Sequence, residues 1–210
     1  MAVDFSKQNL SAYFATLGAM ERRIVATDET GARLDLAAVM GAAMERAQLT
    51  HDAGKKLMFI GNGGSSTVAS HMAEDYTKAG GIRAMAFNDP AFLTCLGNDL
   101  GFDQIFAKQI EMFAQPGDML VAISSSGNSQ NILNGVFAAQ KRGCWVMTLS
   151  GFTLDNLLRN LGDINVYVPS SQYGFVEIAH LAVCHAMLDI AMGWQDRADP
   201  ERRSLKVVSA

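Results

Sequence analysis

A short apolar run that ends in a glycine turn constrains the fold of this chain more than any other stretch. Residues 57–60 have the length and composition of a buried strand, and Gly61-Asn62-Gly63-Gly64-Ser65 leads from it into a helical pattern. A strand that passes through a tight turn onto a helix is the building unit of parallel α/β sheets. The turn also offers backbone N–H groups at a helix N-terminus, where anions bind. By itself, it is equally compatible with an ordinary tight connection.

A second strand and loop of the same kind favour the anion site. Residues 119–123 form another apolar run, and Ser124-Ser125-Ser126-Gly127-Asn128-Ser129 joins it to a further helical pattern. Capping a helix requires only one of these serines. Four hydroxyls beside a helix N-terminus exceed that need, and they can bind a phosphate group without any lysine. We therefore expect the two loops to form one phosphate site.

The remainder of this region alternates between strand and helix patterns. We expect strands at residues 57–60, 84–87, 119–123, 145–149 and 164–168, and helices at about 66–78, 103–114, 129–142, 153–160 and 174–193. Continuous apolar strands between amphipathic helices predict a five-stranded parallel sheet with helices on both faces. Ligands bind such sheets at the carboxyl ends of the strands, where both loops lie.

The first 55 residues read differently, as two helices over 6–25 and 34–53 separated by a break at 27–31. Two helices without a sheet cannot bury a core alone, so they should pack on the α/β body or on a partner subunit. The domain organisation predicted is an N-terminal helical oligomerisation segment (1–55), an α/β domain (56–195) and a polar tail (196–210).

Composition narrows the classes of partner. Charged residues make up 18% of the chain, below the roughly 25% typical of soluble domains. The excess of apolar surface favours oligomerisation. A net charge of -4 without a dense Lys/Arg run argues against nucleic acid. No signal peptide and no apolar run near the ~20 residues of a membrane span is evident. Cys95, Cys144 and Cys184 lack metal-site spacing and read as buried thiols. We expect a cytoplasmic protein that binds no membrane.

Histidines and carboxylates recur on two of the predicted helices. His71 and Asp75 lie four residues apart and share a helix face, and Glu177, His180 and His185 lie on the last helix. Such groups can bind Zn²⁺ or transfer protons. A lone histidine on an apolar helix is more often a core residue, so both interpretations stay open from the pattern alone.

One further polar pair has two readings. Asn98-Asp99, within Gly97-Asn98-Asp99-Leu100-Gly101-Phe102, is compatible with a plain turn or helix N-cap and with a contact to a polyol.

Taken together, these motifs resemble the phosphoheptose isomerases, which belong to the sugar isomerase (SIS) domain family. The resemblance covers most of the chain and is carried by Gly61-Asn62-Gly63-Gly64-Ser65, His71-Met72-Ala73-Glu74-Asp75, Gly97-Asn98-Asp99-Leu100-Gly101-Phe102 and Ile123-Ser124-Ser125-Ser126-Gly127-Asn128-Ser129. It implies a flavodoxin-like SIS fold and a homotetramer with active sites between subunits. It also implies interconversion of sedoheptulose 7-phosphate and glycero-manno-heptose 7-phosphate, which supplies heptose for bacterial lipopolysaccharide and related surface polysaccharides.

The resemblance assigns a role to each matching position. The phosphate would be held by Ser124, Ser125, Ser126 and Ser129. The sugar would be contacted by Asn62, Gly63, Gly64, Asn98, Asp99 and Glu177. One Zn²⁺ per subunit would be bound by His71, Asp75, Glu177 and His185, with Asp75 as the catalytic base and His185 as an acid/base for the oxygens.

Two of these positions depart from the family pattern. Asp75 stands where the family has glutamate, and Glu177 stands where it has glutamine. These departures leave two alternatives to phosphoheptose isomerisation. One is a non-catalytic SIS tetramer that binds phosphosugars and acts through a protein partner, as the replication-initiator-associating members do. The other is an isomerase of a different sugar phosphate.

Overall fold

Five parallel strands form the centre of the fold. The computed structural model describes residues 6–195, and its central strands are β3 (Leu57–Gly61), β4 (Ala84–Ala86), β5 (Met119–Ser124), β6 (Trp145–Gly151) and β7 (Ile164–Val168). They lie in the order β7-β6-β5-β3-β4, with parallel pairing throughout. All residues of β3, β5 and β7 are buried, as continuous apolar runs predict for strands covered on both faces. The predicted parallel sheet is confirmed.

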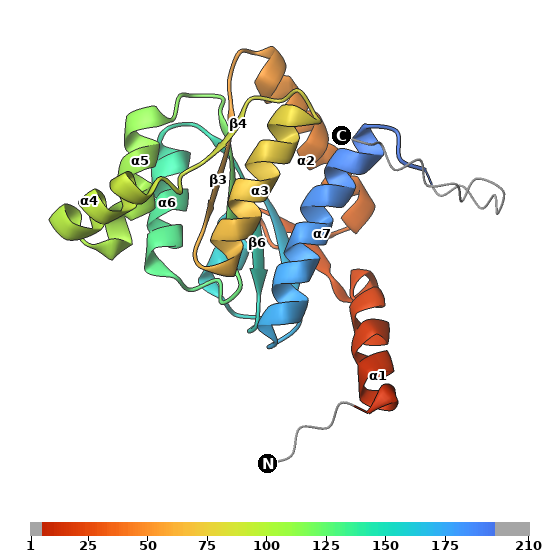
Figure 1. The fold of residues 1–210 in the computed structure, drawn as a ribbon. Helices are drawn as coiled ribbons and strands as arrows, with labels where there is room; N and C mark the ends of the chain where they lie inside the picture. The colour runs from red at the N-terminus through yellow and green to blue at the C-terminus, as the bar shows by residue number, and fades with distance from the viewer. Residues whose placement is uncertain (1–5, 196–210) are drawn as a thin grey trace, which may run out of the picture.

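Helices cover both faces of this sheet (Figure 1). One face carries α2 (Leu36–Asp52), α3 (Gly64–Lys78) and α7 (Tyr173–Ala191), and the other carries α4 (Pro90–Leu100), α5 (Ile105–Phe113) and α6 (Gln130–Lys141). Successive residues of β5 alternate between the two resulting cores. Val121 and Ile123 pack with the α3 and α7 face, whereas Leu120 and Ala122 pack with the α5 and α6 face.

The N-terminal segment corrects the expectation of two simple helices. After α1 (Lys7–Gly18) and a short 3₁₀ helix, η1 (Glu21–Arg23), the chain forms β1 (Val25–Asp28) and β2 (Arg33–Leu34). β1 pairs antiparallel with β7 and β2 pairs with β1, so the sheet has seven strands. The prediction of a helix over 6–25 was wrong beyond α1, because contacts with the distant β7 override local helical periodicity.

The predicted break at 27–31 is the turn between β1 and β2. The Asp28 carboxylate accepts hydrogen bonds from the backbone N–H groups of Thr30 (2.9 Å) and Ala32 (3.0 Å). Gly31 has a φ of 81°, a conformation that costs glycine little. The break signal therefore marked a hairpin rather than a helix–helix connection.

Three other expectations need correction. The helix expected at 153–160 is only a 3₁₀ turn, η3 (Leu157–Asn160), and the one expected at 103–114 begins as the 3₁₀ turn η2 (Phe102–Gln104) before α5. Asn98 and Asp99 lie within α4, so they form neither a turn nor an N-cap. Cys95, also in α4, is exposed, whereas Cys144 and Cys184 are buried as expected. The predicted polar tail at 196–210 lies outside the described residues.

Helix α7 is apolar along much of its 19 residues. It has a mean hydropathy of 1.4 over an 18-residue window and is, by length and composition alone, long and apolar enough to cross a membrane. The expectation that no run approaches this length is therefore wrong. The helix packs on α3 and on the sheet, and it contributes to the core Val176, Ala179, His180, Val183, Cys184, Met187 and Leu188. The packed core accounts for the apolar residues on one face of the helix, whereas Ile178 and Ile190 on its other side are exposed.

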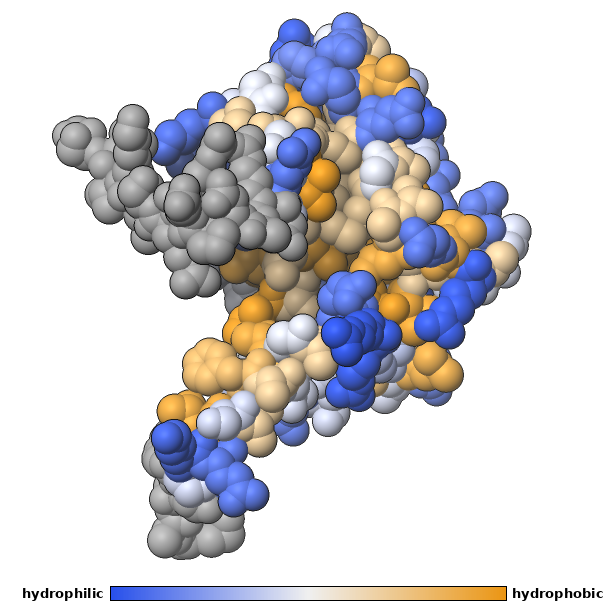
Figure 2. Space-filling model, turned by 90° about the vertical axis from the view of Figure 1, so that its right-hand side faces the viewer, coloured by the Kyte–Doolittle hydropathy of each residue, from blue (hydrophilic) through white to orange (hydrophobic). Residues whose placement is uncertain are grey.

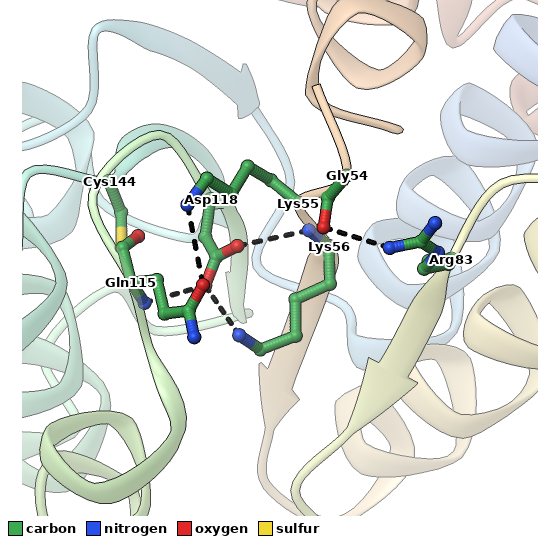
Figure 3. Close-up of polar contacts among 7 residues, drawn as sticks. All are labelled: Gly54, Lys55, Lys56, Arg83, Gln115, Asp118 and Cys144. Atoms are coloured by element: carbon green, nitrogen blue, oxygen red, sulfur yellow. Dashed lines mark hydrogen bonds and ion pairs between the residues drawn. The ribbon is translucent and has the colours of Figure 1, made fainter. Parts of the chain in front are cut away.

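An ion pair joins the residues that directly precede β3 and β5, at the edge opposite their glycine and serine loops (Figure 3). Lys56 Nζ lies 2.6 Å from Oδ2 of Asp118, whose side chain is fully buried. The same carboxylate accepts hydrogen bonds from the backbone N–H groups of Lys56 (3.0 Å) and Gln115 (2.7 Å). These bonds fix the start of the β3–β5 register, in which Leu57 pairs with Met119.

His180 predicts a loss of stability in acid. Its ring is fully buried, and Nε2 lies 3.0 Å from the backbone oxygen of Ser150, which can only accept, so Nε2 carries the proton of a neutral ring. Burial lowers the pKa of His180 from 6.5 to about 4. The unfolded chain therefore binds more protons between these values, and stability present above pH 6.5 falls as the pH drops toward 4, by roughly 3 kcal/mol.

Urea denaturation between pH 4 and 7 measures this effect. We expect the His180→Gln variant to be less stable at pH 7 and to show a shallower dependence on pH than the wild type. Parallel curves for the two proteins would mean that His180 does not contribute to the acid response.

Candidate active site

The loops after β3 and β5 meet because these two strands are neighbours in the sheet. Their paired residues run to Gly61 and Ile123, so both loops leave the same edge. Between them lies a cavity of about 230 Å³, lined by Asn62, Gly63, Gly64, Ser65, Ser124, Ser125, Ser126, Ser129, Tyr173 and Glu177. The structure thus brings together both predicted loops and adds residues from the N-terminal part of α7.

Two helices begin at this cavity without a side-chain cap. α3 follows Gly63, which has a φ of 54° and no side chain to act as a cap. α6 follows Ser129, whose side chain makes no hydrogen bond to the first turn of the helix. By contrast, Asp35 and Asp89 accept hydrogen bonds from the first turns of α2 and α4. The free N–H groups and positive ends of α3 and α6 are therefore available to an anion in the cavity.

Neighbouring segments hold the serine loop in shape. Ser124 Oγ accepts a hydrogen bond from the N–H of Gly127 (3.1 Å), and the oxygen of Gly127 accepts one from Leu158 (2.9 Å). Gly127 has a φ of 64°, and the side chain of Asn156 occupies the space that a Cβ would need. Ser125 Oγ is buried and has no hydrogen-bond partner within residues 6–195. A bound phosphate would satisfy this hydroxyl.

The charge of the cavity comes from one carboxylate. The described residues that line it include no lysine or arginine, so an anion would be held by hydroxyl and backbone donors. Glu177 approaches the start of α3 so closely that a Cβ on Gly64 would collide with its carboxylate. A larger residue at position 64 would therefore displace the Glu177 carboxylate from the start of α3.

Three predicted metal ligands gather where α3 and α7 lie side by side (Figure 1). Asp75 Oδ2 lies 3.5 Å from His71 Nε2 and 3.6 Å from His185 Nδ1. One potential ligand atom from each residue falls within 4.8 Å of the others. Two imidazoles and one carboxylate form a donor set that suits Zn²⁺ with an open coordination position. The fourth predicted ligand, Glu177, lies outside this group and lines the cavity instead.

Asn98 and Asp99 are not brought to the cavity of this chain. They lie in the last turn of α4, where Asn98 Nδ2 donates to Asp99 Oδ1 (2.8 Å). Neither residue is among those that line the cavity. Their predicted contact with the sugar stays a prediction.

Ser65, at the end of the predicted glycine turn, also lines the cavity. The structure adds two residues that the sequence did not single out. Tyr173 lines the cavity, and Asn131, in the first turn of α6, bonds the side chain of Asn62. The sequence could have indicated Tyr173, because it precedes Glu177 by four residues and so lies on the same face of the last helix. No sequence pattern could have indicated Asn131, since its partner Asn62 lies on a different strand-to-helix loop.

Comparisons with known proteins agree with this geometry. A family model described as the SIS domain matches residues 13–151. The phosphoheptose isomerase of Geobacter sulfurreducens is 36% identical over 143 residues, which cover 65% of this chain and 75% of that protein. The phosphoheptose isomerase of Rhodospirillum rubrum is 40% identical over 141 residues, covering 64% and 74% respectively.

Solved structures give the same result over more of the chain. The phosphoheptose isomerase of Neisseria gonorrhoeae superposes with a TM-score of 0.74 at 30% identity, covering 88% of this chain and 98% of that one. The corresponding structure from Francisella tularensis gives 0.74 at 28% identity, with coverage of 87% and 96%. This chain therefore belongs to the SIS domain family and, within it, to the phosphoheptose isomerases.

Proposed function

We propose that this protein interconverts sedoheptulose 7-phosphate and glycero-manno-heptose 7-phosphate. The observation that carries the proposal is that α3 and α7 each connect the cavity to the His71, Asp75 and His185 cluster. Gly64 lies at the cavity and His71 lies seven residues further along α3, a rise of about 10 Å. This separation suits an elongated molecule with its phosphate at one end and its reacting carbons at the other.

The proposed reaction needs three tasks from the chain. The serine loop and the starts of α3 and α6 hold the phosphate, which fixes the distance to the reacting carbons. The carboxylate of Asp75 takes a proton from C1 or C2 of the sugar, which gives an enediol intermediate. It then returns the proton to the other of these two carbons. His185, beside Asp75, exchanges protons with the two oxygens.

Zn²⁺ fits this cluster by its donor set and is part of the proposal as a cofactor. His71, Asp75 and His185 would hold it, and Glu177 remains a fourth candidate if its side chain turns from Gly64. When bound, the metal would polarise the carbonyl and diol oxygens.

Removal of the metal should lower both stability and turnover. We expect dialysis against a chelator to reduce the melting temperature, because a ligand that binds only the folded state stabilises it, and added Zn²⁺ to restore it. The His71→Ala variant should show neither the loss nor the recovery. Equal melting curves for the wild type before and after chelation, with no zinc in the purified protein, would contradict a zinc site here.

The function itself is tested by incubation with sedoheptulose 7-phosphate, with and without Zn²⁺, followed by NMR for the aldose. We expect the aldose to form. Turnover of another sugar phosphate alone would support the assignment as an isomerase but would change the assigned substrate. Retained phosphosugar binding without any product would favour the non-catalytic SIS protein.

A homotetramer is also part of the proposal. Helix α1 projects from the body (Figure 1) and has no buried residue, although it carries Leu10, Tyr13 and Phe14. Apolar side chains gather on the face that α1 leaves (Figure 2). An apolar groove beside α1 is lined by residues that include Met40 of α2 and Ile178 of α7.

A change on this helix tests the assembly. We expect the wild type to be a tetramer by light scattering and Leu10→Glu with Phe14→Glu to give smaller species, because two charges would be placed on the apolar stripe. Lys7→Glu, on the same helix, should leave the assembly intact. A monomeric wild type would refute the tetramer.

A cytoplasmic location and a role in lipopolysaccharide synthesis complete the proposal on the strength of the family resemblance.

A further inference from the structure

A reciprocal pair of side-chain amides links the two loops of the cavity. Asn62 Nδ2 donates to Asn131 Oδ1 at 2.8 Å, and Asn131 Nδ2 donates to Asn62 Oδ1 at 2.8 Å. Asn62 follows β3 and lines the cavity, whereas Asn131 is buried in the first turn of α6 and does not line it. The two residues are 69 positions apart in the chain.

The pair lies where the two uncapped helices begin. Asn62 directly precedes Gly63, the N-cap residue of α3, and Asn131 is the second residue of α6. Two reciprocal hydrogen bonds restrict rotation of the two side chains as well as the distance between them. The pair therefore sets the spacing between the helix starts that would share one phosphate group.

The pairing also fixes which way the amide of Asn62 points. If either amide were flipped, oxygen would face oxygen and nitrogen would face nitrogen. Each amide has two N–H groups and two acceptor positions, so the pair leaves Asn62 one of each. A substrate hydroxyl at the cavity would therefore meet a donor and an acceptor of Asn62 in defined directions.

We propose that Asn131 is a positioning residue that acts on the substrate through Asn62. It orients the Asn62 amide and holds the glycine loop against the serine loop, without touching the substrate itself. This inference rests on the proposed binding of a phosphosugar in the cavity. It assigns a role to a residue outside the cavity wall.

A double-mutant cycle tests the proposal. We expect Asn131→Ala to lower kcat/KM for sedoheptulose 7-phosphate by roughly tenfold, mostly through kcat, because a displacement of ~1 Å can cost up to a hundredfold. In the Asn62→Ala background, the same substitution should have no further effect, since its route to the substrate is already gone. A purely structural role would produce the same loss in both backgrounds and would overturn the proposal.

Asn134→Ala is the matched control. Asn134 lies one turn further along α6, and its side chain also makes a hydrogen bond, to the backbone oxygen of Asp103 (3.0 Å). We expect this variant to lose stability without a change in kcat/KM measured well below its melting temperature. If Asn131→Ala does not fold, Asn131→Leu keeps nearly the same size and removes both hydrogen bonds to Asn62 without adding a charge. An unchanged kcat/KM in a folded Asn131 variant would also overturn the proposal.

Failure of the isomerase assignment would give a different result. If the wild type does not turn over sedoheptulose 7-phosphate, the same cycle is measured with inorganic phosphate by calorimetry. We then expect Asn131→Ala to weaken phosphate binding several-fold in the wild-type background and not in the Asn62→Ala background. Equal weakening in both would reject the positioning role whatever the activity.

Discussion

Asp75→Asn is expected to lower the turnover of sedoheptulose 7-phosphate by roughly 10²- to 10⁴-fold, the usual contribution of a general base. The amide has nearly the same shape as the carboxylate but cannot accept the substrate proton. Asp75 lies between the two imidazoles, with Oδ2 3.5 Å from His71 and 3.6 Å from His185. The serine loop is untouched, so binding of the phosphosugar should persist, as calorimetry can measure.

Two variants serve as controls. Glu74→Gln removes a neighbouring carboxylate on α3 whose side chain is 60% exposed, and its turnover should stay close to that of the wild type. Asp75→Glu keeps a carboxylate and should retain more turnover than Asp75→Asn, which would show that the charge matters more than the chain length. Undiminished turnover in Asp75→Asn would remove Asp75 from the mechanism.

Asp118→Ala is expected to cause the largest loss of stability, about 3–5 kcal/mol in the free energy of unfolding. The side chain is fully buried, and its removal leaves Lys56 Nζ without its ion pair. It also leaves the backbone N–H groups of Lys56 and Gln115 without acceptors. An unsatisfied buried donor costs more than the hydrogen bond itself gained. Urea denaturation at neutral pH measures the difference.

The exposed pair of Lys108 and Glu111, with Nζ 3.2 Å from the carboxylate, provides the comparison. Glu111→Ala should change stability by less than about 1 kcal/mol, because solvent screens such pairs. Since the Asp118 bonds lie at the sheet edge opposite the cavity, Asp118→Ala should keep its kcat well below its melting temperature. A loss of stability no larger than that of Glu111→Ala would mean that the buried pair contributes little.

The sequence predicted the strands that are buried on both faces. In β3 and β5 an apolar run ends at glycine or serine, and both of these signals are local in the sequence. Once the strands were taken as parallel, the two loops were expected at the same edge of the sheet. β1 was missed because its pairing with β7 joins Val25 to Tyr167, far apart in the chain. The start of α4 could have been found, since Asp89 before Pro90 is a common N-terminal signature.

The site was predictable to the extent that its residues share one element. His71 and Asp75 meet because they lie one turn apart on α3. The arrival of His185 depends on how α7 packs beside α3, which no spacing in the sequence specifies. The direction of the Glu177 side chain, toward Gly64 and away from the cluster, is likewise set by packing. The pair of Asn62 and Asn131 was invisible for the same reason.

The antiparallel pairing of β1 with β7 also bears on how the chain is made. β1 is the first strand to emerge from the ribosome, yet β7, with which it pairs, is the last of the described strands to be synthesised. The parallel strands β3 to β6 can assemble as they emerge, whereas β1 and β2 must wait for nearly the whole chain. Closing this long loop late is slow relative to local contacts. The N-terminal hairpin is therefore expected to join the sheet as the final step of its assembly, after β7 has been synthesised and has paired with β6.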